Sequence, residues 1–279
     1  MISILKDIIE APNNSLILID EIEAGFHPYI QRKLANIIQY ISWIDKKQFI
    51  ITSHSPTLIS AFPQISRKFI DKKNDGTFEV INKISKHAAY SKMDAKAYPI
   101  LNLYCEDNEA EFLIKKVILE INIEHKFFDR LINIIKSGPI HEVKNDYERH
   151  KRNFNQLRLK IGYCCVFDGD YKNEPNYSTY HDNPEEFSFF LYPFTAPEKF
   201  LIKAFLNDNH NDSLLTALTY NDHHSLFDEM VDLGLATDSN DARNKCFDSF
   251  KSKSEYRKLK KDLSEFLIKT VKHFSELCD

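Results

Sequence analysis

The sequence predicts an α/β protein with parallel sheets, followed by a helical C-terminal segment. Short apolar runs alternate with stretches whose apolar residues recur every three or four positions, which is typical of strands joined by crossover helices. Three of the apolar runs end directly on carboxylates. From residue 207 onward the chain is charged and helical in pattern, without a strand signal. We therefore predict three regions, at residues 1–92, 97–206 and 207–279.

The composition favours a folded chain of one large or two ordinary domains, since 43% of the 279 residues are hydrophobic. The net charge of −4 excludes an overall positive field that attracts nucleic acid, so any DNA contact must use a local patch. None of the five cysteines forms a C-x-x-C motif, which favours reduced thiols in the cytoplasm over disulfides or zinc. No apolar run approaches the roughly 20 residues of a membrane span, so we expect no membrane partner.

The first predicted strand is the apolar run at residues 16–19, which leads straight into Asp20 and Glu21. A continuous apolar run of this length favours a strand that is buried on both faces of a parallel sheet. Such a strand ends at the carboxyl edge of the sheet, where ligands bind. One of the two carboxylates can hold a magnesium ion and the other can polarise a water, which is the Walker B arrangement.

A helix is expected from Pro28, and its apolar face is formed by Ile30, Leu34, Ile37, Ile38 and Ile41. We expect Trp43 and the phenylalanines in the core. A second apolar strand covers residues 48–52 and leads into Ser53-His54-Ser55-Pro56. His54 thus follows the strand that comes after Asp20 and Glu21.

Two further runs, at residues 68–70 and 78–84, flank Asn74-Asp75-Gly76. Asp-Gly between apolar runs predicts a β-hairpin. The polar residues 86–96 are interpreted as a linker.

Strand–helix alternation resumes at Ile100 and predicts a parallel sheet with right-handed crossovers. The expected strands cover residues 101–105, 131–135, 161–167 and 187–192. Helices are expected at residues 108–121, from the Ser137-Gly138 turn to about residue 157, and from Pro197-Glu198 onward.

Three carboxylates follow these strands: Glu106 ends the first, and Asp168 and Asp170 end the third. Acids at the ends of two parallel strands can converge on a divalent ion, and oxygen ligands suit magnesium. A D-x-D motif alone is weak, because most such pairs are solvated. Here it follows a strand, a glutamate ends an earlier strand, and a Ser-Gly turn lies between them.

A phosphate-binding P-loop, which would complete an ATP site, is absent from the sequence. Such a loop needs two spaced glycines followed by lysine, and none of the six glycines precedes a lysine. We therefore expect the chain to be the C-terminal part of a larger ATPase. The missing lobe would come from a preceding segment or from a partner chain, and we expect little ATP turnover by this chain alone.

Asp20-Glu21, Gly25-Phe26-His27-Pro28 and His54, in this order, resemble the ATPase heads of the SMC, RecF and OLD (overcoming lysogenisation defect) group. The resemblance implies that Asp20 lies on the magnesium side, that Glu21 is the general base, and that His54 contacts the γ-phosphate of ATP.

Residues 100–206 resemble a TOPRIM domain, the metal-binding fold of type II topoisomerases, primases and OLD nucleases. The resemblance implies that Mg²⁺ or Mn²⁺ is held by Glu106, Asp168 and Asp170. A second metal would then be completed by Glu198 together with Glu109 or Glu111.

The chain departs from the TOPRIM pattern just after Glu106. The family often has glycine at the next position and an acid four residues on, where this chain has Asp107 and Ala110. The ligands of a second metal are therefore left open.

An ATPase head followed by a TOPRIM domain is the organisation of OLD-family ATP-dependent endonucleases, which include subunits of bacterial anti-phage systems. The resemblance implies a cytoplasmic, homo-oligomeric, ATP-regulated and metal-dependent nuclease that hydrolyses DNA. A topoisomerase would need a tyrosine nucleophile domain, for which residues 207–279 are few, and a primase would need a priming apparatus that we do not find. The alternative from another class is a truncated, non-catalytic module that only dimerises or binds DNA.

Weaker candidates remain beside these acids. Lys172 and Lys199 flank them and could bind a phosphate, although simple surface lysines explain them equally well. The basic run at residues 243–261 could follow a DNA backbone, but we favour a solvated helix. His210 and the pair His223-His224 lack metal spacing and are interpreted as surface residues.

Overall fold

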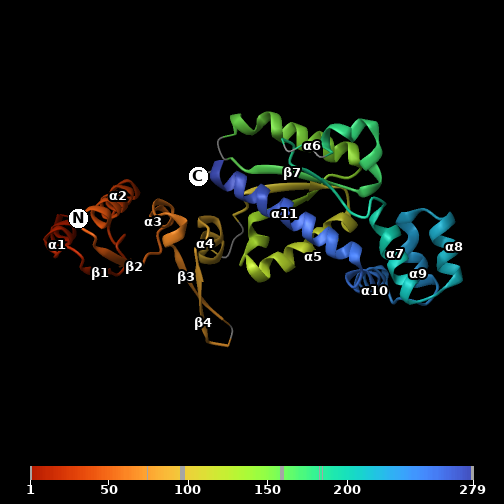
Figure 1. Cartoon of the computed structure of the whole chain (residues 1–279), viewed down its shortest axis with the longest axis horizontal. Helices are drawn as coiled ribbons and strands as arrows, with labels where there is room; N and C mark the ends of the chain where they lie inside the picture. The colour runs from red at the N-terminus through yellow and green to blue at the C-terminus, as the bar shows by residue number, and fades with distance from the viewer. Residues whose placement is uncertain are drawn as a thin grey trace. The chain divides into compact units, whose positions relative to one another are not determined.

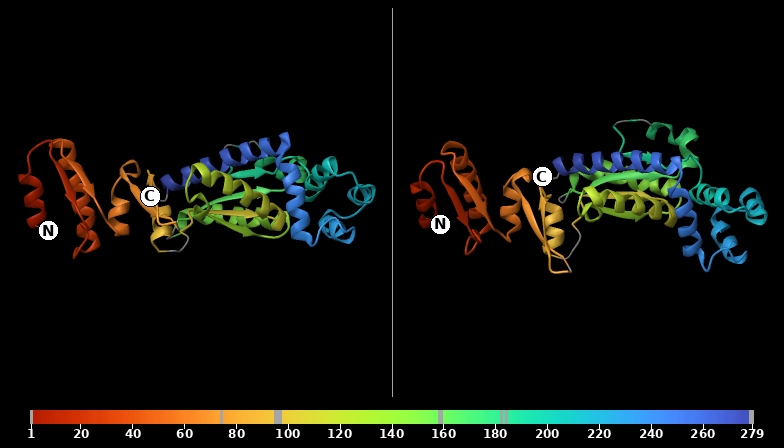
Figure 2. Two further views of the ribbon diagram at one scale, coloured as in Figure 1. Left: turned by 90° about the horizontal axis from the view of Figure 1, so that it is seen from below. Right: turned by 60° about the horizontal axis from the view of Figure 1, so that its bottom comes forward.

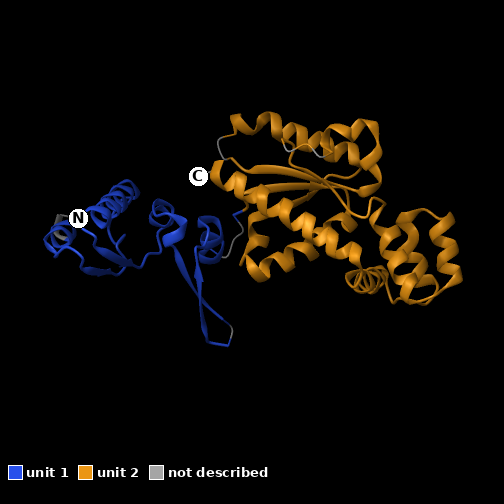
Figure 3. Cartoon of the chain, in the orientation of Figure 1, with its two compact units in different colours: residues 1–98 blue, residues 99–279 orange. Residues whose placement is uncertain are grey.

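A computed structural model of the chain describes residues 2–73, 75–94, 98–157, 160–181, 183 and 185–277. The chain divides into two compact units, residues 1–98 and residues 99–279 (Figure 3). The predicted start of the second region at residue 97, together with Asn74 and Cys278, lies outside the described residues. Among the described residues, no helix is long and apolar enough to cross a membrane.

The first unit is built on a two-stranded parallel sheet (Figure 1). Strand β1 (Leu16–Ile19) pairs in parallel with β2 (Gln48–Ile51), as the two apolar runs predict. Helix α2 (Pro28–Ile44) connects them, and α1 (Ile2–Glu10) precedes β1. His27 caps α2, because its Nδ1 atom accepts a hydrogen bond from the Tyr29 N–H.

Only one face of this small sheet is buried. The buried face packs against α2 residues Leu34 and Ile38, and it is formed by Ile17, Ile19, Phe49 and Ile51. On the other face, Leu16, Leu18 and Ile50 are 56%, 69% and 59% exposed. The prediction of a strand buried on both faces is therefore wrong for β1, because no described element covers its second face.

The outer side of α2 carries a second exposed apolar surface, which is formed by Tyr29, Ile37, Tyr40, Trp43 and Ile44. Trp43 is 70% exposed, so its expected place in the core is wrong. Residues at this spacing share one side of a helix, and that side faces away from the core of the unit.

The rest of the first unit contains the predicted hairpin and an unpredicted helix. Strands β3 (Lys68–Lys72) and β4 (Phe78–Asn82) pair antiparallel, after α3 (Pro56–Ala61) and the 3₁₀ turn η1 (Gln64–Ser66). Helix α4 (Lys86–Met93) occupies most of the expected linker, and residues 95 and 96 of that linker lie outside the described residues. Ser85 caps α4 and Ala88 and Ala89 are buried, so tertiary packing explains the helix.

The second unit contains a four-stranded, fully parallel sheet with the strand order β6-β5-β7-β8. The strands are β5 (Leu101–Cys105), β6 (Ile132–Lys136), β7 (Gly162–Phe167) and β8 (Ser188–Phe190). The helices between the first three strands are α5 (Asn108–Glu124) and α6 (Ile140–Asn153), which lie on opposite sides of the sheet in Figure 1. The predicted strand–helix alternation is confirmed here.

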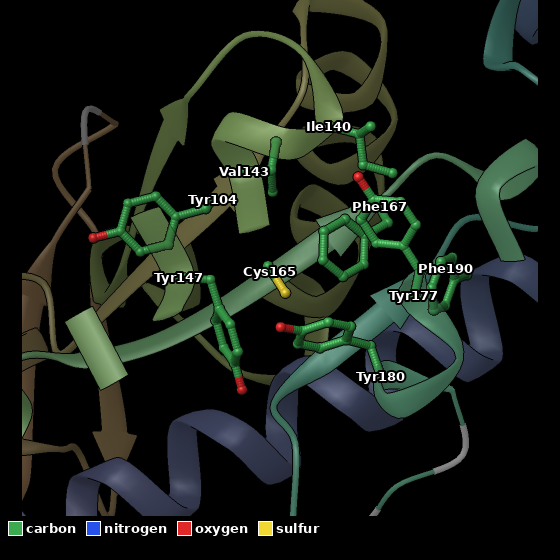
Figure 4. Close-up of a cluster of buried hydrophobic side chains, with 9 residues drawn as sticks. All are labelled: Tyr104, Ile140, Val143, Tyr147, Cys165, Phe167, Tyr177, Tyr180 and Phe190. Carbon is green, nitrogen blue, oxygen red and sulfur yellow. The ribbon is translucent and has the colours of Figure 1, made fainter. Parts of the chain in front are cut away.

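Both faces of the central strands are buried. The face toward α6 carries a cluster that is rich in aromatic side chains, with Tyr147 of α6 packed beside Cys165 and Tyr180 (Figure 4). The alternate residues Leu103, Cys105, Cys164 and Val166 point to the other face and are fully buried. This sheet therefore has the two-sided cover that parallel sheets require.

The C-terminal helices belong to the same compact unit as the sheet. They are α7 (Pro197–Asp208), α8 (Asp212–Tyr220), α9 (Leu226–Asp232), α10 (Ser239–Lys251) and α11 (Ser254–Leu277). Helix α10 packs on α7, and α11 runs back along the sheet, where it contacts α5 and β7 (Figure 2). The 3₁₀ turns are η2 (Phe128–Leu131), η3 (Phe154–Gln156), η4 (Gly169–Asn173), η5 (Pro175–Tyr180) and η6 (His223–Ser225).

Candidate functional site

The strand order of the second unit locates a ligand-binding edge. The chain adds β6 on one side of β5 and then β7 on the other side, so the connections leave β5 and β7 in opposite directions. Ligands of open parallel sheets bind outside the carboxyl ends of the strands at such a switch point. Glu106 directly follows β5, and Asp168 directly follows β7.

Asp168 is the most unusual side chain at this edge. It is 6% exposed, and its Oδ1 atom has no hydrogen-bond partner among the described residues. Burial raises its pKa well above the usual value, and the negative charges of Glu106, Asp107 and Asp170 raise it further. A buried carboxylate is unfavourable without a cation or a hydrogen-bond donor, so this position is organised for a partner that the chain does not supply.

Glu106 has the same character. Burial, followed by the charges of Asp107 and Asp170, raises its pKa to about 7. Its Oε2 atom and the hydroxyl of Ser137, just after β6, are also buried without a described partner. Unpaired oxygens thus follow three adjacent strands, and carboxylate and hydroxyl oxygens are suitable ligands for a hard divalent cation. The residues present therefore fit the magnesium or manganese ion that the sequence predicts.

Asp170 is exposed in η4, and its charge acts on both Glu106 and Asp168. Asp107, which the sequence analysis treated as a departure, adds a fourth negative charge. Its Oδ1 atom also caps α5 by accepting hydrogen bonds from the N–H groups of Glu109 and Ala110, at 2.8 and 3.0 Å.

Gly169 lets two segments of this edge approach closely. A Cβ atom there would lie 2.3 Å from the Leu191 carbonyl oxygen and 2.7 Å from the Phe194 Cα, so only glycine fits. The loop after β8 is thereby held against the end of β7. Lys172 stacks on the ring of Phe194, with its Nζ atom 3.5 Å from the ring centroid, and Lys199 is exposed in the first turn of α7.

Two of the predicted second-metal ligands have cationic partners instead. Glu109 is 7% exposed and forms a bidentate ion pair with Arg243 of α10, in which Nε lies 2.5 Å from Oε2 and Nη2 contacts Oε1. Glu111 pairs with Lys115 at 2.6 Å and with Lys136 at 3.3 Å, which lowers its pKa. A paired carboxylate is a poorer metal ligand, so neither residue resembles Asp168.

Glu198 lies in the first turn of α7 and is 2% exposed. Burial raises its pKa to about 7. Its Oε1 atom lies 3.2 Å from Nδ1 of His224, and ligand atoms of Glu198, His223 and His224 all lie within 4.8 Å of one another. His224 is exposed and His223 is partly exposed, as predicted, but the prediction that they lack metal spacing is wrong, because both approach Glu198. The spacing of these residues in the sequence did not reveal the group, because tertiary packing places η6 beside α7 and the three residues do not share one helix.

In the first unit, the loops after β1 and β2 are tied together at the carboxyl edge of the sheet. The Thr52 hydroxyl donates to Asp20 Oδ1 and accepts a hydrogen bond from the Glu21 N–H at 2.9 Å. Glu21 has a φ of 45°, in the left-handed region. Asp20, Glu21 and His54 therefore come from neighbouring loops at one edge, and all three are exposed.

Glu23, which was not among the predicted site residues, forms a second hydrogen-bonded link between these loops. Its Oε1 atom accepts a hydrogen bond from the His54 N–H at 2.5 Å. Burial raises the pKa of Glu23, but hydrogen bonds from the His54 N–H and the Ser53 hydroxyl lower it more, so that it lies below its usual value. A third tie joins the Ser55 hydroxyl to Gln31 at 2.5 Å.

Comparison with known families concerns the first unit. Residues 2–60 match the family model described as "AAA domain, putative AbiEii toxin, Type IV TA system". This match supports an ATPase head of the ABC/RecF-like kind, a nucleotide-binding class that usually also binds Mg²⁺. It covers only the first part of the chain and does not extend to the sheet of the second unit. No curated protein matches the chain. Residues 2–60 are therefore similar to an AAA-type ATPase domain.

Proposed function

We propose that the chain is the nuclease-bearing part of an OLD-type, ATP-regulated DNA endonuclease, with a TOPRIM-like site in residues 97–206. The observation that supports this most is the pair of buried, unpaired carboxylates of Glu106 and Asp168 at the switch point of a parallel sheet. Such a pair is poised to bind a divalent cation, and Asp170 adds an exposed carboxylate beside it.

In this proposal Mg²⁺ or Mn²⁺ is held by Glu106, Asp168 and Asp170. When bound, the ion supplies charge neutralisation on the scissile phosphate and an activated water. Asp168 keeps its side chain out of bulk solvent, and Gly169 fixes the loop beside it. Lys199, next to Glu198 in the sequence, is exposed and offers a cation for a DNA phosphate.

ATP regulation would require a lobe that contributes the phosphate-binding loop. One feature supports such a partner. The uncovered face of the β1–β2 sheet is apolar, and parallel sheets are rarely open to water on one side. In the assembled ATPase, Asp20 would lie on the magnesium side, Glu21 would act as the general base, and His54 would contact the γ-phosphate. A dimer or higher homo-oligomer, and a role in anti-phage defence, are parts of the same proposal.

Plasmid nicking tests the nuclease proposal. Purified protein, together with its ATPase partner where one is required, is incubated with supercoiled plasmid and Mg²⁺ or Mn²⁺. We use the name acidic edge for Glu106, Asp107, Asp168 and Asp170. We expect nicking by the wild type and by D212N, whose substituted acid lies outside the acidic edge with a side chain that is 90% exposed, but not by D168N. Equal nicking by D168N and wild type would favour the non-catalytic module that only dimerises or binds DNA.

A further inference from the structure

We propose that Glu198, which the sequence resemblance assigns to a second magnesium, instead forms with His223 and His224 a binding site for a transition-metal ion of the zinc class, next to Glu106 and Asp168. Their ligand atoms all lie within 4.8 Å of one another, and they are the group of three such residues that satisfies this limit in the described part of the chain. Glu198 is 2% exposed and is held in the first turn of α7. The proposal does not require the nuclease activity.

The distances match those of a metal site. Zinc binds imidazole nitrogen and carboxylate oxygen at about 2.0–2.2 Å, which places two tetrahedral ligands about 3.4 Å apart. Glu198 Oε1 and His224 Nδ1 are already separated by 3.2 Å. The His223 ring is 4.0 Å from the His224 ring between centroids, so a small side-chain rotation would complete the triad.

Asp222 supports the histidines from outside the triad. Its Oδ1 atom lies 3.5 Å from Nδ1 of His223 and accepts a hydrogen bond from the His224 N–H at 3.1 Å. A carboxylate on one ring nitrogen fixes the tautomer and directs the other nitrogen to a metal, which is the usual arrangement around metal-binding histidines. Asp222 therefore leaves Nε2 of His223 as the atom that would bind the ion.

The chemistry of the donors selects the kind of ion. Two imidazoles and one carboxylate suit Zn²⁺, Fe²⁺, Co²⁺ or Ni²⁺, whereas Mg²⁺ prefers oxygen ligands only. The side chains of His223 and His224 are 30% and 63% exposed, so the ion would keep open positions for water or another ligand. Burial and the neighbouring His224 lower the pKa of His223, which favours the neutral imidazole that binds a metal.

The contact of His224 with Glu198 at 3.2 Å is also explained by a simple hydrogen bond, and the test must separate this interpretation from ours. The chain offers a matched control. His210 lies 3.1 Å from Asp212, a similar His–carboxylate pair at the surface, and it belongs to no group of three ligands among the described residues.

The probe is Co²⁺, whose visible absorption reports nitrogen ligation and low coordination number. Full-length wild type, H223A/H224A, E198Q and H210A are titrated with Co²⁺, and bound Co²⁺ is then displaced with Zn²⁺. We expect one Co²⁺ per chain to give the visible band in the wild type and in H210A, because Co²⁺ held by the carboxylates of Glu106, Asp168 and Asp170 lacks nitrogen ligands. H223A/H224A and E198Q should bind at least about 100-fold more weakly, because ligands are removed outright.

Thermal denaturation of each variant shows whether it is folded, and D168N separates this site from the acidic edge. D168N should lose nicking and keep the Co²⁺ band. Loss of the nuclease proposal would leave the Co²⁺ result untouched. A wild type without the band, or a folded H223A/H224A that binds Co²⁺ as tightly as the wild type, would overturn the proposal.

Discussion

In both parallel sheets of this chain an acid directly follows a strand, but the two sheets differ in how far their faces are buried. In the second unit both faces of β5 and β7 are buried. Asp168, which directly follows β7, is 6% exposed and has an oxygen without a described hydrogen-bond partner. In the first unit one face of β1 is exposed to solvent. Asp20, which directly follows β1, is exposed and hydrogen-bonded to Thr52. An apolar run followed by a carboxylate therefore predicts where an acid lies, but not whether its site is complete.

Electrostatics make the same distinction. Besides burial, the charges of four further acids raise the pKa of Asp168, and this repulsion is unfavourable without a cation. In the first unit, Asp20 accepts a hydrogen bond from the Thr52 hydroxyl, Glu23 accepts one from the His54 N–H, and Ser55 is hydrogen-bonded to Gln31. In our proposal the second unit binds a metal with its own residues, whereas the first unit acts together with another lobe.

The largest expected effect is on D168N. Nicking should fall by about a thousandfold or more, since losing a ligand removes several kcal/mol of barrier stabilisation. The metal-free variant should at the same time be no less stable than the wild type, because a buried charge is replaced by a neutral isostere. Nicking assays and thermal denaturation in EDTA measure the two effects. If D168N lost activity only because it unfolds, the result would contradict a metal-binding role for Asp168.

Arg243→Ala should be the most destabilising of the charge substitutions. It leaves Glu109 buried at 7% exposure without its bidentate partner, which costs about 3–5 kcal/mol of unfolding free energy. Lys258→Ala removes a pair with Asp262 at 2.8 Å whose side chains are 53% and 37% exposed, so it should cost less than about 1 kcal/mol. Urea denaturation compares them. Similar losses for both would show that the Glu109 pair is not structural.

Stability of the metal-free protein should depend on pH through Glu106 and Asp168. Their pKa values are raised in the folded state, to about 7 for Glu106, so their contribution is fully present below the unfolded pKa values and is lost as pH rises toward 7. We expect the melting temperature in EDTA to fall by a few degrees over this window, and Mg²⁺ to restore it at pH 7.5. E106Q/D168N should flatten the dependence. An unchanged slope in that variant would assign the effect to other groups.

The smallest effect is expected at the open face of the first sheet. Leu18→Ser should change the unfolding free energy by less than about 0.5 kcal/mol, because Leu18 is 69% exposed. Leu103→Ala, at 0% exposure in β5, should cost about 2–5 kcal/mol. Denaturation of the two variants gives the loss of unfolding free energy at each position, which shows whether that face of the sheet is buried. A large loss for Leu18→Ser would mean that its face is covered after all.

Much of the second sheet could be predicted from the sequence, because its signals are local. The runs before Glu106 and Asp168 are short and apolar, and turn residues follow them directly. The Glu109–Arg243 pair and the Glu198–His224 contact could not be predicted, since each joins helices that are distant in the sequence. Helix α4 was missed for a related reason: its pattern is polar, and burial of Ala88 and Ala89 decides its structure.

The central claim is that the edge of the second sheet, and not that of the first, binds magnesium in this chain. Isothermal titration of Mg²⁺ into the wild type, D168N and D20N tests it most directly. The account predicts binding by the wild type, binding by D20N with the same affinity, and at least about 100-fold weaker binding by D168N, because Mg²⁺ keeps few protein ligands and loses one. Binding that survives in D168N and disappears in D20N would contradict it.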